Sequence, residues 1–123
     1  MYVHDPLTHA IIGGGIAVHR ELGPGLPEAT YEEALCIELT DAKLSYTRQI
    51  GVPVRYKSHL IGEYRPDLVV EGRVVVEVKS VEALTAVHQA QALAYMRILR
   101  VPVGLLINFN SEVLRTNVKR LAL

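Results

Sequence analysis

The sequence has very little cysteine and no excess of charge. Cys36 is its only cysteine, which excludes an intrachain disulfide framework, a four-cysteine zinc site and a four-cysteine iron–sulfur cluster. With 13 basic and 13 acidic residues, the chain lacks the overall positive charge that draws strongly basic proteins to nucleic acid. Any contact with DNA or RNA must therefore be local or assisted by a metal ion. The scarcity of cysteine fits a reducing cytoplasm, where we expect the protein to be located.

Long apolar runs are also missing. No stretch of about 20 residues is free of charge, and residues 1–6 contain neither the basic nor the apolar region of a secretory signal. We therefore expect a soluble protein with no membrane partner. A length of 123 residues allows one hydrophobic core, so residues 1–123 are predicted to form a single domain.

Turn residues and apolar spacing predict an α/β fold. The order of elements is α-α-β-β-β-α-β-β, which indicates a central mixed sheet flanked by helices. The predicted helices cover residues 6–22, 27–43 and 85–100, and the predicted extended segments cover residues 46–50, 52–57, 60–70, 73–79, 103–109 and 113–121.

The most informative feature is Asp67, followed ten residues later by Glu77-Val78-Lys79. Two β-branched runs surround a Glu71-Gly72 turn signal, which predicts a β-hairpin. The two carboxylates are hard oxygen ligands suited to Mg²⁺ or Mn²⁺, and the Val78 carbonyl is placed to complete part of the coordination. Lys79 points to the same side of the strand as Glu77, where an ammonium group can orient water or stabilise transition-state charge.

The hairpin must satisfy one geometric condition to build this site. A two-residue turn at residues 71–72 would send Asp67 and Glu77 to opposite faces of the sheet. The metal site therefore predicts a bulge or a three-residue connection over residues 71–73, or a strand bend at Asp67. The alternative is that Asp67 ends a strand while Glu77 pairs with Lys79 at a sheet edge, because ion pairs on strands are common.

Two pairs of helical residues and one arginine are further candidates. Gln91 and Tyr95 lie four residues apart and share one helix face, and Glu28 and Tyr31 lie three apart on another helix. Each pair can face a ligand, but for a pair that stands alone a surface polar residue beside a partly buried tyrosine is the favoured interpretation. Arg65, next to the acidic motif, is placed to bind a phosphate.

Several other residues have two interpretations. Gly13-Gly14-Gly15 lies inside the first predicted helix, and close helix packing is favoured over a phosphate-binding loop because no strand precedes it. Cys36 is predicted to be a small buried side chain. His19 either packs on the helix or lines a cleft, and His88 either contacts substrate or covers the start of the third helix.

The set of motifs resembles a known family of nucleases. Pro66-Asp67 with Glu77-Val78-Lys79 resembles the PD-(D/E)XK nuclease motif, and Gly25-x-x-Glu28-x-x-Tyr31 is similar to the signature that names the GxxExxY proteins. The likeness runs nearly end to end, through residues 18–25, 31–35, 81–84 and 104–110. It implies a restriction-endonuclease-like fold with an αβββαβ core, which fits the predicted order of elements.

Gln91-x-x-x-Tyr95 is similar to a helix motif of the lambda-exonuclease-like branch of that superfamily, where the motif lies beside the metal site. In that branch a helix glutamate also reaches the metal, which suggests Glu28 as a third acidic group. The resemblance therefore implies a nuclease with a divalent metal cofactor and a nucleic-acid partner.

The sequence as a whole predicts a Mg²⁺- or Mn²⁺-dependent nuclease that hydrolyses phosphodiester bonds in DNA. The alternative is a catalytically silent nucleic-acid-binding or assembly module, which zero net charge and small size favour. An exposed sheet edge and apolar helix faces would also allow a homo-oligomer. The predicted catalytic residues are Glu28, Asp67, Glu77 and Lys79, the predicted metal ligands are Asp67, Glu77, Val78 and Glu28, and the predicted substrate-binding residues are Gln91, Tyr95, Tyr31 and Arg65.

Overall fold

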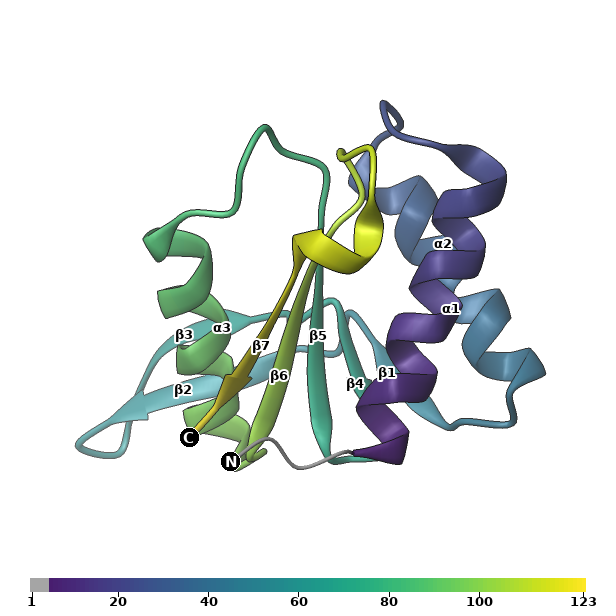
Figure 1. The fold of residues 1–123 in the computed structure, drawn as a ribbon. Helices are drawn as coiled ribbons and strands as arrows, with labels where there is room; N and C mark the ends of the chain where they lie inside the picture. The colour runs from purple at the N-terminus through teal and green to yellow at the C-terminus, as the bar shows by residue number, and fades with distance from the viewer. Residues whose placement is uncertain (1–4) are drawn as a thin grey trace.

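A five-stranded mixed sheet lies at the centre of the protein, for which the computed structural model describes residues 5–123 (Figure 1). The strand order is β1-β4-β5-β6-β7; β5 and β6 are parallel, and the other neighbouring strands are antiparallel. This arrangement confirms the predicted mixed sheet. The strands are β1 (Tyr46–Arg48), β4 (Leu68–Val70), β5 (Val74–Lys79), β6 (Val103–Asn108) and β7 (Val118–Ala122).

Helices cover both faces of the sheet (Figure 1). One core joins α1 (Pro6–Leu22) and α2 (Glu28–Asp41) to the face that carries Val76 and Val78, and Cys36 is buried in it as predicted. The other core joins α3 (Ala86–Leu99) to the opposite face. Because β5 is buried on both faces, it reads as a continuous apolar run interrupted only by Glu77 and Lys79.

Side-chain caps fix the starts of two helices. The Leu7 backbone N–H donates to Asp5 Oδ1 over 2.9 Å at the start of α1. At the start of α3, the Thr85 N–H donates to His88 Nδ1 over 3.0 Å, and the Thr85 hydroxyl accepts from the His88 N–H. His88 therefore covers the helix start, one of its two predicted roles. In α2, Pro27 occupies the N-cap, so that helix begins one residue later than predicted.

The glycines of α1 allow close packing, as favoured by the sequence. A Cβ added to Gly14 would lie 3.3 Å from Glu38 Cβ of α2, and one added to Gly15 would lie 3.2 Å from Leu114 Cδ2. Gly13 is exposed and has open space around it. Helix packing thus accounts for two of the three glycines.

The hairpin between β4 and β5 has the register that the acidic motif requires. Leu68 pairs with Val76 and Val70 pairs with Val74, so a three-residue connection over 71–73 joins the strands. Glu71 and Gly72 adopt left-handed φ angles of 53° and 63°. The predicted three-residue connection is confirmed, and it places Asp67 opposite Glu77.

The predicted strand over residues 60–70 is wrong, because the chain breaks it into two strands. β3 (His59–Tyr64) pairs with β2 (Val52–Tyr56) in a separate two-stranded ribbon, and only β4 joins the central sheet. Pro66 has no N–H for a ladder hydrogen bond and lies at the break. Residues 113–121 also differ from prediction, because a 3₁₀ helix, η1 (Leu114–Asn117), precedes β7.

None of the helices described within residues 5–123 combines the length and apolar content needed to cross a bilayer.

Candidate active site

Asp67 and Glu77 meet at the end of the sheet where β4 begins and β5 ends. The Asp67 backbone N–H donates to Glu77 Oε2 over 2.7 Å, and the Val78 N–H donates to Asp67 Oδ2 over 2.8 Å. These two hydrogen bonds hold the carboxylates side by side. Because β5 lies between β4 and β6, the alternative of a Glu77–Lys79 ion pair on an edge strand is wrong. No such pair is found among residues 5–123.

Burial makes it costly to keep both carboxylates charged. Glu77 is 3% exposed, and its pKa is raised to about 8 by desolvation and, second, by the nearby Asp67. Desolvation also raises the pKa of Asp67 to about 6, although the Val78 N–H opposes that shift. A buried and a half-buried acid that resist ionisation together are suited to a divalent cation, whose charge offsets their repulsion.

The donor set fits Mg²⁺ or Mn²⁺ better than a metal that needs a full cage of side chains. Within residues 5–123, no cluster of three or more histidine, cysteine, aspartate or glutamate side chains has the geometry to hold a metal. Mg²⁺ commonly binds through one or two carboxylates and keeps several waters. Asp67 and Glu77 provide those two carboxylates, and the Val78 carbonyl remains the predicted backbone ligand.

Glu28 lies near the site but apart from the carboxylate pair. It is exposed, and its Oε2 accepts from the Ser80 N–H over 3.1 Å, just beyond Lys79. Ser80 Oγ also donates to the Leu26 carbonyl over 2.7 Å. Glu28 therefore ties the start of α2 to the end of β5, and its predicted role as a metal ligand remains a prediction.

Glu32 is an acidic residue of the site that the sequence analysis missed. It lies one turn after Glu28, is 6% exposed, and raises the pKa of both Asp67 and Glu77. The Gln49 amide bridges Glu32 and Asp67. Its Nε2 donates to Glu32 Oε1 over 3.0 Å and to Asp67 Oδ1 over 3.1 Å. The only sequence signal for it was its i+4 spacing from Glu28.

Lys79, Gln91 and Tyr95 are brought to the same side of the sheet as the carboxylates. The Lys79 ammonium is near enough to lower the pKa of both Asp67 and Glu77, although larger effects outweigh it. Burial raises the pKa of Tyr95, and the charges of Glu77 and Asp67 raise it further, whereas Gln91 opposes the shift. Tyr95 thus lies near the carboxylate pair, with Gln91 one turn before it on α3, and their predicted role in positioning substrate remains a prediction.

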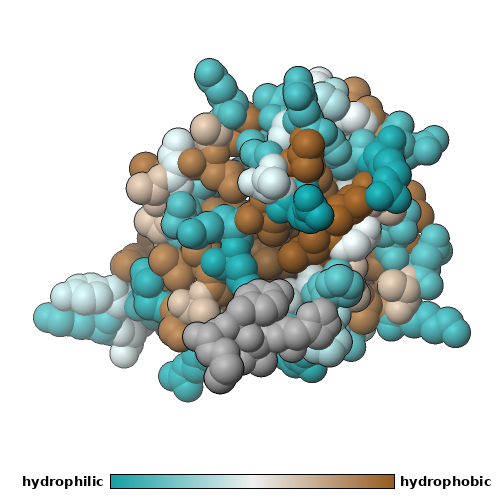
Figure 2. All heavy atoms as spheres, viewed as in Figure 1, coloured by the Kyte–Doolittle hydropathy of each residue, from teal (hydrophilic) through white to brown (hydrophobic). Residues whose placement is uncertain are grey.

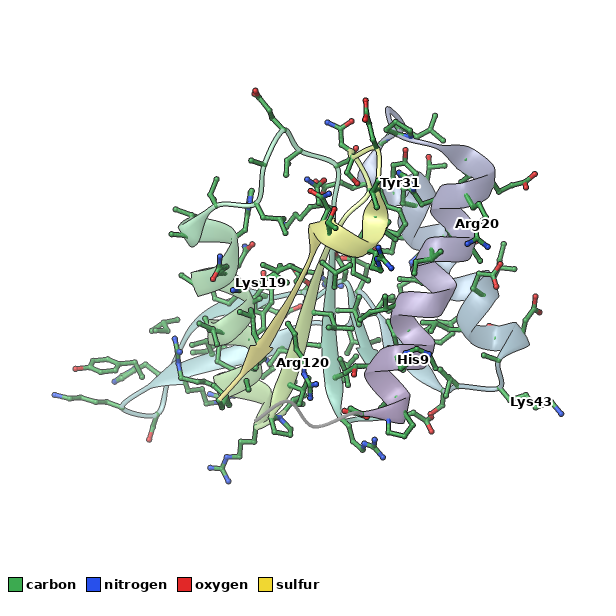
Figure 3. All side chains as sticks on the ribbon, viewed as in Figure 1. His9, Arg20, Tyr31, Lys43, Lys119 and Arg120 are labelled. Carbon is green, nitrogen blue, oxygen red and sulfur yellow. The ribbon has the colours of Figure 1, made fainter. Side chains whose placement is uncertain are left out.

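Tyr31 is part of the core, which corrects its predicted role in substrate binding (Figure 3). Its ring is fully buried and stacks on Phe109 with 4.6 Å between centroids. Its hydroxyl donates to the Gly23 carbonyl over 2.5 Å and accepts from the Leu26 N–H over 3.0 Å. Tyr31 therefore fixes the loop before α2, where Gly25 has a φ of 102°.

Arg65 supports the site from the solvent side. Its Nη1 donates to the Gln49 carbonyl over 3.1 Å, and its Nη2 pairs with Glu63 at 3.0 Å. Because Gln49 contacts both Glu32 and Asp67, Arg65 helps to hold the loop that orients Asp67. Its predicted contact with a substrate phosphate remains a prediction.

A cavity of about 530 Å³ lies away from the carboxylate pair, between the end of α1 and η1. His19 lines this cavity, away from the carboxylate pair, with Nε2 at 2.6 Å from the Ser111 carbonyl oxygen. Figure 2 shows apolar surface between α1 and η1 on this side of the molecule. The cavity contains none of the predicted site residues, so its size does not make it the active site.

A central mixed sheet flanked by helices, with two adjacent carboxylates and a lysine at its end, defines a restriction-endonuclease-like fold of the nuclease type. The model of the PD-(D/E)XK nuclease superfamily matches residues 5–121, and the chain belongs to that superfamily. Its members are nuclease-type phosphodiesterases that generally use divalent metal ions. Comparisons with curated proteins and with solved structures found no match.

Proposed function

We propose that the protein is a Mg²⁺- or Mn²⁺-dependent deoxyribonuclease of the GxxExxY type, within the lambda-exonuclease-like branch of its superfamily. The observation that carries this proposal is the three-residue connection between β4 and β5, which sets Asp67 beside Glu77. A two-residue turn would have separated the carboxylates. The burial of Glu77, together with Lys79 on the same face, supports a catalytic use.

Asp67, Glu77 and the Val78 carbonyl would hold the cation. When bound, it neutralises the phosphate charge, lowers the pKa of the attacking water and supports the leaving oxyanion. The backbone N–H groups of Asp67 and Val78 keep the two carboxylates oriented for this purpose. We assign the auxiliary acidic role to Glu28, as the resemblance suggests, or to Glu32, whose contact with the same Gln49 amide as Asp67 supports it.

Lys79 would act on the water that attacks phosphorus. Its ammonium group can orient the water oxygen and stabilise the negative charge that develops on the phosphoryl oxygens. The new bond forms between water oxygen and phosphorus as that water loses a proton to solvent. The bond to the departing sugar oxygen breaks, and that oxygen takes up a proton from solvent. Gln91 and Tyr95 would hold the substrate from α3, where Tyr95 lies near the carboxylates.

The proposal is tested by incubating wild type and Asp67→Ala with single-stranded DNA, duplex DNA and RNA, each with Mg²⁺, Mn²⁺ or a chelator. We expect wild type to cleave DNA only when metal is present, and we expect Asp67→Ala to lose that cleavage. Cleavage by Asp67→Ala at the wild-type rate would refute the assignment. Binding of DNA by folded wild type without any cleavage would identify the catalytically silent module instead.

A further inference from the structure

A pocket of about 250 Å³ lies between α3 and the β2–β3 ribbon. We call it the ribbon pocket. It contains no acidic or basic side chain, and its surface is formed by apolar groups, two tyrosines and one amide. Its lining residues are Val54 and Tyr64 from the ribbon and Gln91, Ala94, Tyr95 and Ile98 from α3.

The ribbon pocket lies next to the candidate active site. Its two tyrosines, Tyr64 and Tyr95, also line a small void together with Pro66, which directly precedes Asp67 in the chain. The Tyr95 hydroxyl lies close enough to Asp67, Glu77 and Tyr64 for all three to raise its pKa, after burial. A nucleotide whose phosphate lies at the carboxylates would therefore have its base within reach of the pocket.

Tyr64 is held as an exposed aromatic wall. Its side chain is 49% exposed, and its ring lies across Gly62, where an added Cβ would approach Tyr64 Cε2 to 3.0 Å. The absence of a side chain at Gly62 therefore gives the ring its place on the ribbon. The ribbon itself extends away from the central sheet (Figure 1). The exposure of Tyr64 leaves this wall open to solvent on one side.

The size and chemistry of the pocket suit a ligand with a single planar ring. Its volume is below the range of about 300–1,000 Å³ that encloses a drug-sized ligand. Aromatic walls stack on nucleobases of any sequence, and the Gln91 amide offers both a donor and an acceptor for a base edge. A neutral lining suits a base, while Lys79 at the adjoining site suits its phosphate.

We propose that the ribbon pocket binds one unpaired base of a single-stranded DNA substrate, next to the phosphodiester to be cleaved. This inference rests on the proposed function for the position of the phosphate, and it adds the substrate class. A base in a duplex is stacked on both sides and enters such a pocket only after it has been unstacked. The pocket therefore favours single-stranded over duplex DNA.

The test measures binding in a chelator, where the metal-dependent cleavage cannot occur. The probes are a fluorescent single-stranded oligothymidine and a duplex that contains it, followed by anisotropy. We expect Tyr64→Ala to weaken single-strand binding about tenfold and to leave duplex binding unchanged. Tyr64→Phe keeps the ring and should bind as wild type. The matched control is Tyr56→Ala, because Tyr56 is 62% exposed on the same ribbon but lies outside the pocket.

A second variant keeps Tyr64 and fills part of the ribbon pocket with a larger side chain. Ala94→Leu narrows the pocket from α3 with a good helix former and should cause the same selective loss. Equal binding of single strand and duplex by wild type, or no change in either variant, would overturn the inference. Metal-dependent cleavage measured separately would still stand in that case, so failure of the pocket and failure of the nuclease are distinguishable.

Discussion

At the scale of single residues, Glu77 links the chemistry of the site to its stability. Its carboxyl has a pKa of about 8 in the folded protein against an ordinary value of 4.5, because burial and Asp67 disfavour its charge. Between these two values the unfolded chain has released a proton that the folded chain retains. The free energy of unfolding must therefore fall as the pH rises through that window.

We predict that Glu77→Gln is more stable than wild type at pH 8 in a chelator. The amide fills the same space without a charge to desolvate, and the gain should be about 1 kcal/mol or more, roughly 4 °C in Tm. Thermal unfolding at pH 5 and pH 8 measures it. The two proteins should differ less at pH 5, and a gap that is larger at pH 5 would contradict the assigned pKa shift.

Glu28 and Glu32 offer a matched pair of variants for the auxiliary acid. Because Glu32 is buried and reaches Asp67 through Gln49, we predict that Glu32→Gln lowers the cleavage rate by about tenfold or more, and that Glu28→Gln has the smaller effect. Initial rates in Mn²⁺ at saturating substrate separate them. A larger loss of rate in Glu28→Gln than in Glu32→Gln would identify Glu28 as the auxiliary acid, as the resemblance implies.

At the scale of elements, the register of β4 against β5 decides whether a site exists. The Glu71-Gly72 signal predicted a hairpin, but it could not distinguish a two-residue turn from a three-residue connection. The structure shows that Glu71 N–H donates to the Ser45 carbonyl over 2.9 Å, and that Glu71 Oε2 accepts from the Ser45 N–H over 2.8 Å. Ser45 and Glu71 are 26 residues apart in the sequence. Turn preferences of the residues near Glu71 therefore could not predict these contacts.

We predict opposite effects on stability for alanine at two glycines. Gly72→Ala should destabilise the protein by about 1 kcal/mol, because Gly72 has a φ of 63° that disfavours a Cβ. Gly13→Ala should stabilise it by about 1 kcal/mol, because Gly13 is helical and nothing lies within 4 Å of an added Cβ. Urea unfolding checks both, and a destabilised Gly13→Ala would mean that α1 packs differently at that residue.

Helices were predicted better than strands, for a physical reason. Apolar spacing, together with Asp5 and Thr85 as caps, is local, and the structure places α1 and α3 as predicted. The separation of β3 from β4 depends on pairing partners elsewhere in the chain. Pro66 marked a break, yet the sequence did not reveal that the segment before it leaves the sheet for a ribbon.

At the scale of the whole molecule, the site forms where α2, α3 and the β4–β5 hairpin converge at one end of the sheet. The sequence spacing of Asp67, Glu77 and Lys79 was enough to predict that they form one site. It could not show which side of α2 faces the sheet, so it assigned Tyr31 to substrate and missed Glu32. Packing of Tyr31 on Phe109, a contact between distant parts of the chain, settles the orientation of that helix.

The central claim is that Asp67, Glu77 and Lys79 form a metal-dependent phosphodiesterase site. The most direct measurement is the rate of single-stranded DNA cleavage in Mn²⁺ by wild type and by Lys79→Ala, purified in parallel. We predict cleavage by wild type that a chelator stops, and a rate for Lys79→Ala that is lower by about 100-fold or more. Equal rates for the two proteins would contradict the claim, because the cleavage would then come from another site or another protein.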